Sequence, residues 1–312
     1  MATPRFPDMT TAGVGVALVL LPLLVPTTLA SQAAIFATAT LSVTLLLGSV
    51  GLLSFGQGLY LGVGSYAAGI LLRDAGYGLG PSIVLAMLAG AILAGILGAL
   101  IVRRQGVYFV MLTLAFAQMG YFAILAWKDV TGGENGLSGL PRTFSLFGLP
   151  VASAVSFYVL SAGTFLVALM AVQRLNASPF GTVMIAIREN EARTEAIGYD
   201  VKLYKIVALT IAGGIAGLSG ALHAAFLGFV PPNNIELEMS QRILVMAIIG
   251  GVGSPAGALL GAGFYTLVSE FLSEFWARWL ALIALLLIAI VLYLPGGLWS
   301  IGARLMGKRA DA

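Results

Sequence analysis

The side chains that usually carry out catalysis are scarce in this chain. It contains no Cys, so it has no thiolate for a metal site and no disulfide. It also lacks the Gly-x-x-x-x-Gly-Lys-Ser/Thr sequence with which many proteins bind nucleotide phosphates. No carboxylate pair, metal-spaced cluster or nucleophile triad is apparent, and the single histidine, His223, is interpreted as a structural side chain. We therefore expect neither enzymatic activity nor a cofactor bound by this chain.

Uncharged polar residues offer a different chemistry, which is hydrogen bonding to a small solute. The candidates are Ser54, Gln57, Gln118 and Ser254, on or near apolar segments that Gly-rich stretches interrupt at about 51–58 and 250–257. A helix interrupted at membrane depth leaves backbone groups unpaired, so it must be buried in protein or line a polar path. We expect these residues to line a polar path for a small solute. The alternative is that they bond to one another and that the glycines only allow close packing.

The charge of the chain is concentrated in one segment. The stretch "GTVMIAIRENEARTEAIGYDVKLYK", residues 181–205, holds eight of the 29 charged residues. Ser178 followed by Pro179 predicts the N-cap and the first residue of a helix, and Gly198 suits a C-terminal cap. The four basic and four acidic residues balance, whereas a helix that binds anionic lipid is rich in Lys and Arg. This balance favours docking on another protein.

A helix from about residue 180 to residue 190 is the predicted docking element. Met184 and Ile187 form part of its short apolar face and are expected to enter a groove on the partner, while Arg188 and Glu189 set the register at its rim. The full set of predicted docking residues is Phe180, Met184, Ile187, Arg188, Glu189 and Asn190.

The composition shows which elements must position these residues. The chain is 59% hydrophobic and 9% charged, with a mean hydropathy of +1.00, and it has several uncharged apolar runs longer than a membrane span requires. We therefore predict an all-α, polytopic membrane helix bundle with about eight to ten embedded segments and interrupted helices, in one transmembrane domain over residues 1–312. No Asp, Glu, Lys or Arg is expected near the centre of a span. The candidate spans are 11–30, 33–54, 56–72, 80–102, 107–127, 152–173, 204–229, 241–271 and 277–295.

The distribution of Lys and Arg predicts the orientation of the bundle. A cytoplasmic loop 174–205 places eleven basic residues inside and five outside, which agrees with the excess of Lys and Arg in cytoplasmic loops. Both termini are then cytoplasmic, provided that the span 241–271 is divided at 250–257. The first apolar segment is interpreted as a retained helix, because its n-region has Arg5 as its single basic side chain.

Small residues recur at every fourth position along several spans. Ala86, Gly90, Ala94 and Gly98 form one such line, and Gly58/Gly62, Gly213/Gly217 and Gly257/Gly261 are pairs of the same kind. Small side chains let helix backbones approach closely, so these lines predict helix packing, more often within one chain than between subunits.

The charged segment and its neighbours resemble a known family. "GTVMIAIRENEARTEAIGYDVKLYKIVALTIAGGIAGLSGAL" is similar to the cytoplasmic coupling loop and following helix of bacterial branched-chain amino acid ABC transporter permeases of the LivM type. "LLSFGQGLYLGVGSY", "VYFVMLTLAFAQM", "DVTGGENGLSGLPR", "LGFVPP" and "ILVMAIIGGVGSPAGALLGA" agree in order, so the resemblance covers about residues 40–300.

The resemblance implies a particular assembly in the bacterial inner membrane. The chain would pair with a second, related permease of the LivH type, two cytoplasmic ATPase subunits that bind ATP, and a periplasmic substrate-binding protein. In the periplasmic loop 128–142, the residues available to the binding protein would be Glu134, Asn135 and Arg142. Two alternatives stay open: an ABC permease for urea, short amides or other amino acids, and an ion-coupled carrier or channel that works alone.

Overall fold

The computed structural model describes residues 9–141, 144–146, 149–151, 153–275, 278–294 and 296–300. In this part of the chain five helical spans are long and apolar enough to cross a membrane, which confirms the predicted all-α, multi-pass fold. The first span joins α2 (Thr27–Val43) to the π-helix η1 (Thr44–Val50). The others are α4 (Leu79–Ile101), α5 (Val107–Ala126), α7 (Ala154–Asn176) and α10 (Val201–Leu227).

Shorter helices complete the bundle. They are α1 (Met9–Leu24), α3 (Gln57–Arg73), α11 (Leu237–Gly250), α12 (Gly257–Phe275) and α13 (Trp279–Tyr293). The predicted boundary between the first two spans, at about residues 30–33, is wrong, because α1 ends at Leu24 and α2 begins at Thr27. Pro26 explains the earlier break, since proline lacks an N–H and disfavours helical backbone at the residue before it.

Both predicted helix interruptions are confirmed. The first separates Val50, where η1 ends, from Gln57, where α3 begins, and Gly51 at the break has a φ of +77°. The second separates α11 from α12 between Gly250 and Gly257. The π-helical turns before the first break have wider backbone geometry than an α-helix, a feature that is often found at functional sites.

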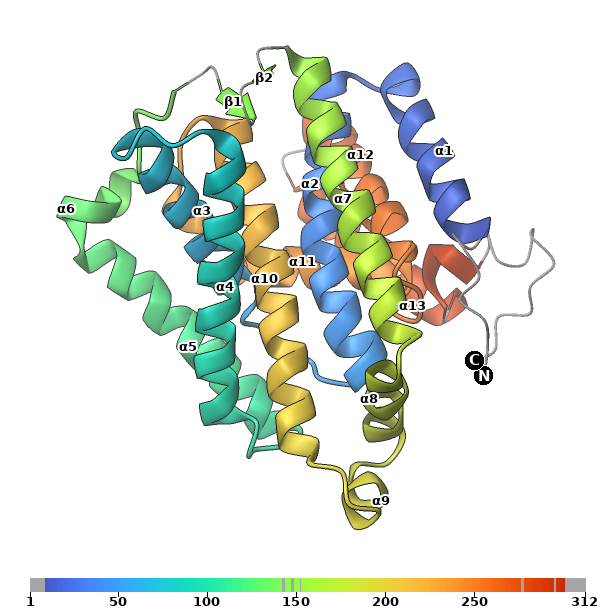
Figure 1. Cartoon of the computed structure of the whole chain (residues 1–312). Coiled ribbons are helices and arrows are strands. Elements are labelled where there is room, and N and C mark those ends of the chain that lie inside the picture. The colour runs from blue at the N-terminus through green and yellow to red at the C-terminus, as the bar shows by residue number, and fades with distance from the viewer. Residues whose placement is uncertain are drawn as a thin grey trace.

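The most closely packed helix pair is α4 with α10, which run side by side (Figure 1). A Cβ on Gly90 would collide with the carbonyl oxygen of Gly213, and a Cβ on Gly213 would collide with Ala94. A Cβ on Gly217 would lie 2.6 Å from the carbonyl oxygen of Ala86. The predicted lines of small residues therefore pack against each other within this chain.

The two ends of the bundle carry different structures (Figure 1). At one end are the short helices α8 (Pro179–Glu189) and α9 (Glu191–Ala196). At the opposite end is a small antiparallel hairpin, β1 (Phe144–Leu146) with β2 (Leu149–Val151), which the sequence analysis does not predict. The loop between α5 and β1 contains α6 (Lys128–Thr131) and the 3-10 turn η2 (Gly133–Asn135), and Leu137 forms a β-bridge with Val230.

Candidate functional site at the interrupted helices

Hydrogen bonds from side chains on two other helices hold the first interruption. The hydroxyl of Ser240, on α11, accepts a hydrogen bond from the Gly58 N–H at 2.9 Å and donates one to the Phe55 carbonyl at 2.7 Å. The Thr113 hydroxyl, on α5, accepts a hydrogen bond from the Phe55 N–H at 3.1 Å. Side chains thus replace the helical bonds that the break removes. This is how non-helical backbone is tolerated inside a membrane protein.

The structure separates the four predicted path residues. Ser54 and Gln57 lie in the first break, and both are buried. Gln57 Oε1 accepts a hydrogen bond from the Ser42 hydroxyl at 2.9 Å, whereas its Nε2 is buried and has no hydrogen-bond partner among the described residues. Gln118 is half-buried on α5. Ser254 belongs to the second break, where its backbone N–H donates to Gly251 O.

The first interruption lies well inside the membrane span. Ser42, the partner of Gln57, precedes the Val50 end of its 24-residue span by eight residues, which is about 12 Å along the helix. Since the hydrocarbon core is about 30 Å thick, this position lies within it. The hydrogen bonds from Ser240 place the start of α11 at the same depth.

The chain reaches this depth before α11 begins. Segment 228–236, with its 3-10 turn η3 (Pro232–Asn234), runs along α3 toward the first break. The contacts pair Gly69 with Val230, Gly62 with Ile235 and Gly58 with Ser240. A re-entrant segment of this kind is tolerated when protein or water surrounds its backbone.

Two charged side chains therefore lie at membrane depth, contrary to the expectation that none would. Arg242 Nη2 donates to Glu238 Oε1 at 3.1 Å, one helical turn apart on α11. The candidate span 241–271 begins one residue before Arg242 and would therefore place this side chain at a membrane surface. That placement is wrong because the helix starts at Leu237, beside the buried break, and not at the membrane surface. This pair is a feature at membrane depth that sequence reasoning missed.

The second interruption meets the charged segment near the end of α2. The Arg188 guanidinium donates a hydrogen bond to the Gly48 carbonyl in η1, and the Ser49 hydroxyl donates to Asn176 Oδ1 at 3.0 Å. A cavity of about 180 Å³ lies between these groups and the second break. Its lining is Thr44, Gly48, Ser49, Asn176, Ile185, Arg188, Val252, Gly253 and Pro255.

The helix α8 begins where the sequence analysis predicts. Ser178 is the N-cap and accepts a hydrogen bond from the Gly181 N–H, and Pro179 is the first helical residue. The helix ends at Glu189 and not at Gly198, because Asn190 has extended backbone and its side chain caps the following helix α9. Asn190 Oδ1 accepts a hydrogen bond from the Arg193 N–H at 2.9 Å.

The predicted orientation of α8 is wrong. Met184 is 0% exposed and Ile187 is 3% exposed, since both side chains pack against the membrane helices of this chain. They therefore do not present an apolar face to a partner. The outward face contains Thr182, Ile185 and Glu189, and Ile185 is 38% exposed. An amphipathic helix buries its apolar stripe on the nearest apolar surface, which here is the bundle itself.

Two contacts tie α8 and α9 to the start of α10. The ring of Phe180 stacks on Tyr204, with centroids 4.9 Å apart. Lys205 is 3% exposed and forms an ion pair with Glu191, so its charge is balanced although it is buried. Phe180 is half-buried by this stacking, and Arg188 and Glu189 are exposed.

The loop at the opposite end leaves Glu134 and Asn135 exposed, while Leu137 and Leu140 anchor it to the bundle. The third predicted contact residue, Arg142, lies outside the described residues. Nearby Arg73 donates hydrogen bonds of 2.6 and 2.8 Å to the carboxylate of Asp74, and these bonds hold the pKa of Asp74 below its usual value.

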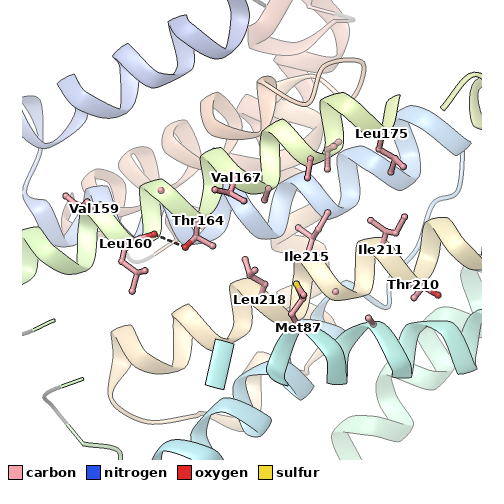
Figure 2. A pocket seen from close by; sticks show the side chains of 16 residues that line it. Met87, Val159, Leu160, Thr164, Val167, Leu175, Thr210, Ile211, Ile215 and Leu218 are labelled. Atoms are coloured by element: carbon pink, nitrogen blue, oxygen red, sulfur yellow. Dashed lines mark hydrogen bonds between the residues drawn. The ribbon is translucent and has the colours of Figure 1, made fainter. Parts of the chain in front are cut away.

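An apolar groove of about 890 Å³ separates α7 from α4 and α10 (Figure 2). The Thr164 hydroxyl in this groove donates to the Leu160 carbonyl at 2.8 Å, and Thr210 bonds to Ile206 in the same way. Its polar groups are therefore used within their own helices. A zwitterion needs polar partners, so this groove does not suit the passage of one.

A helical bundle with two interrupted helices, one of them interrupted inside the membrane and held there by polar side chains, is the architecture of a membrane transport permease. The described residues contain no group of His, Cys, Asp or Glu side chains that would hold a metal ion.

The chain belongs to the family described as "Branched-chain amino acid transport system / permease component", whose model matches residues 25–293. It is 27% identical to the high-affinity branched-chain amino acid transport system permease protein LivM of Salmonella typhimurium strain LT2, over 86% of this chain and 69% of that protein. LivM of Escherichia coli K12 is equally similar, at 27% identity over the same shares. The autoinducer 2 import system permease protein LsrC of Enterobacter sp. strain 638 is 30% identical, over 85% of this chain and 78% of that protein. No solved structure matches the chain.

Proposed function

We propose that this chain is the permease subunit of an ABC importer for branched-chain or other hydrophobic amino acids in the bacterial inner membrane. The observation that carries the proposal is the family match over residues 25–293, which includes both interrupted helices and the charged segment. The two LivM relatives favour branched-chain amino acids as cargo. The chain would supply the path, and ATP hydrolysis would take place in partner subunits.

The proposed partners are a second permease of the LivH type, two ATPase subunits and a periplasmic binding protein. The exposed face of α8 at Thr182, Ile185 and Glu189 supports docking of an ATPase at that end. The exposed residues Glu134 and Asn135 support docking of a binding protein at the opposite end. An importer needs both docking surfaces because its energy and its substrate arrive from opposite sides of the membrane.

The proposed path passes the first interruption, where Ser54 and Gln57 lie, and continues past Gln118 on α5. The buried Nε2 of Gln57 supports this route, since an unpaired donor costs free energy unless a ligand or water uses it. The second break, with Ser254, is proposed to transmit motion from α8, because the cavity beside Arg188 joins the two.

Reconstitution of the assembled transporter in liposomes tests the function. We expect ATP-dependent uptake of radiolabelled leucine in the presence of the binding protein, and none without ATP. Uptake of urea or acetamide with no uptake of leucine would replace the proposed cargo with the alternative, a permease for urea or short amides. Leucine uptake by this chain without any ATPase would exclude an ABC importer and support an ion-coupled carrier.

A further inference from the structure

The charged pair on α11 has an unusual position. Glu238 and Arg242 lie level with the first interruption, yet their side chains are 62% and 31% exposed on the surface of the chain. Charged groups that face hydrocarbon are costly, and within membrane segments they face protein or a water-filled cavity. Lipid therefore does not suit this face of α11. A surface that is exposed in the single chain, charged and at membrane depth needs water or a partner subunit over it.

The surroundings of the pair favour a polar ligand over a closed protein contact. Arg242 Nε is buried and has no hydrogen-bond partner among the described residues, although Nη2 is bonded to Glu238. His223 Nδ1, on α10, is also buried without a partner among the described residues, and the charge of Arg242 acts on this imidazole. Unused donors and acceptors beside an ion pair are the groups that an incoming polar molecule would satisfy.

We propose that Glu238 and Arg242 form a charged station on the translocation path, where the Arg242 guanidinium binds the carboxylate of a passing zwitterion and Glu238 binds its ammonium group. The inference rests on the proposed function and adds the residues that recognise the backbone of an amino acid. Arg suits this role because its planar guanidinium can bind both oxygens of a carboxylate.

The ion pair also explains how such a station would stay neutral when it is empty. Glu238 and Arg242 neutralise each other across one turn of α11 at 3.1 Å. When a zwitterion binds, the single Glu238–Arg242 ion pair is replaced by two pairs, Arg242 with the carboxylate and Glu238 with the ammonium group. Both protein charges therefore keep a partner during passage. A lone ion meets one matching and one opposing charge, which favours zwitterions over simple ions.

Water accessibility tests the position without any transport measurement. The chain has no Cys, so Glu238→Cys introduces one thiol. In the assembled transporter we expect this thiol to react with a membrane-impermeant cationic methanethiosulfonate at least tenfold faster than the thiol of Ile92→Cys, a control at a 61% exposed apolar position on α4. Equal, slow reaction of both thiols would overturn the proposal and assign the pair to a dry contact between subunits.

Uptake tests the recognition. The paired substitution Glu238→Gln with Arg242→Gln keeps hydrogen-bonding side chains and removes both charges. We expect leucine uptake to fall at least tenfold while the yield of assembled transporter stays unchanged. Arg73→Gln with Asp74→Asn, in an exposed ion pair outside the spans, is the matched control and should keep normal uptake.

The two measurements separate the possible failures. Unchanged uptake in the variant with Glu238→Gln and Arg242→Gln would overturn the proposal of a charged station. A loss of uptake that only parallels a loss of assembly would overturn it as well. A wild-type transporter that takes up no amino acid would overturn the proposed function instead. In that case the thiol reaction at position 238 still decides whether α11 lines a water-filled path.

Discussion

The side chains of Met184 and Ile187 lie against the membrane helices, whereas Ile185 faces outward from the same short helix. This alternation is what a helix produces, since consecutive residues are about 100° apart around its axis. The inner pair fixes α8 on the bundle, beside η1 and α7. The outer residue is the one left for a partner. In the proposed assembly, anchoring and docking would be separate tasks of neighbouring side chains.

Ile187→Asp should therefore weaken the permease itself. It places a charge in an apolar site that is 3% exposed, which costs several kcal/mol unless the carboxyl is neutralised. We expect a lower melting temperature of the detergent-purified chain and a smaller monodisperse peak on size exclusion. Ile185→Asp is the matched control, because its site is 38% exposed. It should keep the melting temperature and lose the ATPase on co-purification; a normal melting temperature for Ile187→Asp would contradict the buried orientation.

Gln57→Leu tests a buried polar group at the first interruption. The substitution removes an Nε2 that has no partner in the described residues and an Oε1 that accepts from Ser42. The Ser42 hydroxyl keeps a second acceptor, the Ala39 carbonyl at 2.6 Å. We therefore expect a stability change of about 1 kcal/mol or less but a clearly slower uptake rate. Parallel loss of assembly and uptake would instead assign Gln57 a structural role.

At the scale of elements, glycine spacing predicts much of the packing. The line Ala86–Gly90–Ala94 meets Gly213 and Gly217 in the α4–α10 pair, so the small residues of one helix face those of the other. The fit leaves no room for a methyl group at several of these positions. The stability of the bundle should depend on this seam more than on the looser α7–α10 gap, where the apolar groove lies.

Gly213→Ala and Gly163→Ala form a matched pair of substitutions for the seam. Both place alanine in a helix, which by intrinsic propensity stabilises each helix by about 1 kcal/mol. At Gly213 the new Cβ would collide with Ala94, whereas nothing lies within 4 Å at Gly163. We expect Gly213→Ala to lower the melting temperature by an overpacking cost of about 1–3 kcal/mol, and Gly163→Ala to keep or raise it. Equal melting temperatures would show that the seam can relax.

The interruptions and the start of α8 could be predicted from local signals, which are glycine clusters and the Ser178–Pro179 cap. The depth in the membrane at which α11 begins could not be predicted in this way. Segment 228–235 is an uncharged stretch with two prolines that by its composition suits an outer loop, and only its packing along α3 draws it into the membrane. For the same reason the sequence does not show that Met184 and Ile187 are buried, because it shows an amphipathic stripe but not the surface that covers it.

At the scale of the molecule, α8 and the hairpin β1–β2 lie at opposite ends of the bundle (Figure 1). Their positions do not by themselves show which end faces the cytoplasm. The excess of Lys and Arg at the α8 end predicts that this end is cytoplasmic. The same distribution of Lys and Arg predicts that both termini lie in the cytoplasm, and this stays a prediction. The two loops offer exposed positions for a direct test, Asn135 at one end and Thr182 at the other.

Single cysteines at these positions should label from opposite sides. On the Cys-free chain, we expect Asn135→Cys to react with an impermeant maleimide added to intact spheroplasts. Thr182→Cys should react only after the membrane is opened. Both substitutions are at exposed sites, so neither should change the amount of inserted protein. Labelling of position 135 solely from the cytoplasm would reverse the predicted topology.

The inward packing of Met184 and Ile187 has a consequence for the synthesis of the transporter in the cell. A newly inserted copy that has not met its other subunits already covers the apolar face of α8 with its own helices. It therefore exposes no large apolar surface there that chaperones or quality-control proteases could bind. At this end, the lone subunit therefore needs no partner to cover apolar surface. Attachment of the proposed ATPase would then depend on the small outer face of α8, which favours an attachment that can be reversed and repeated.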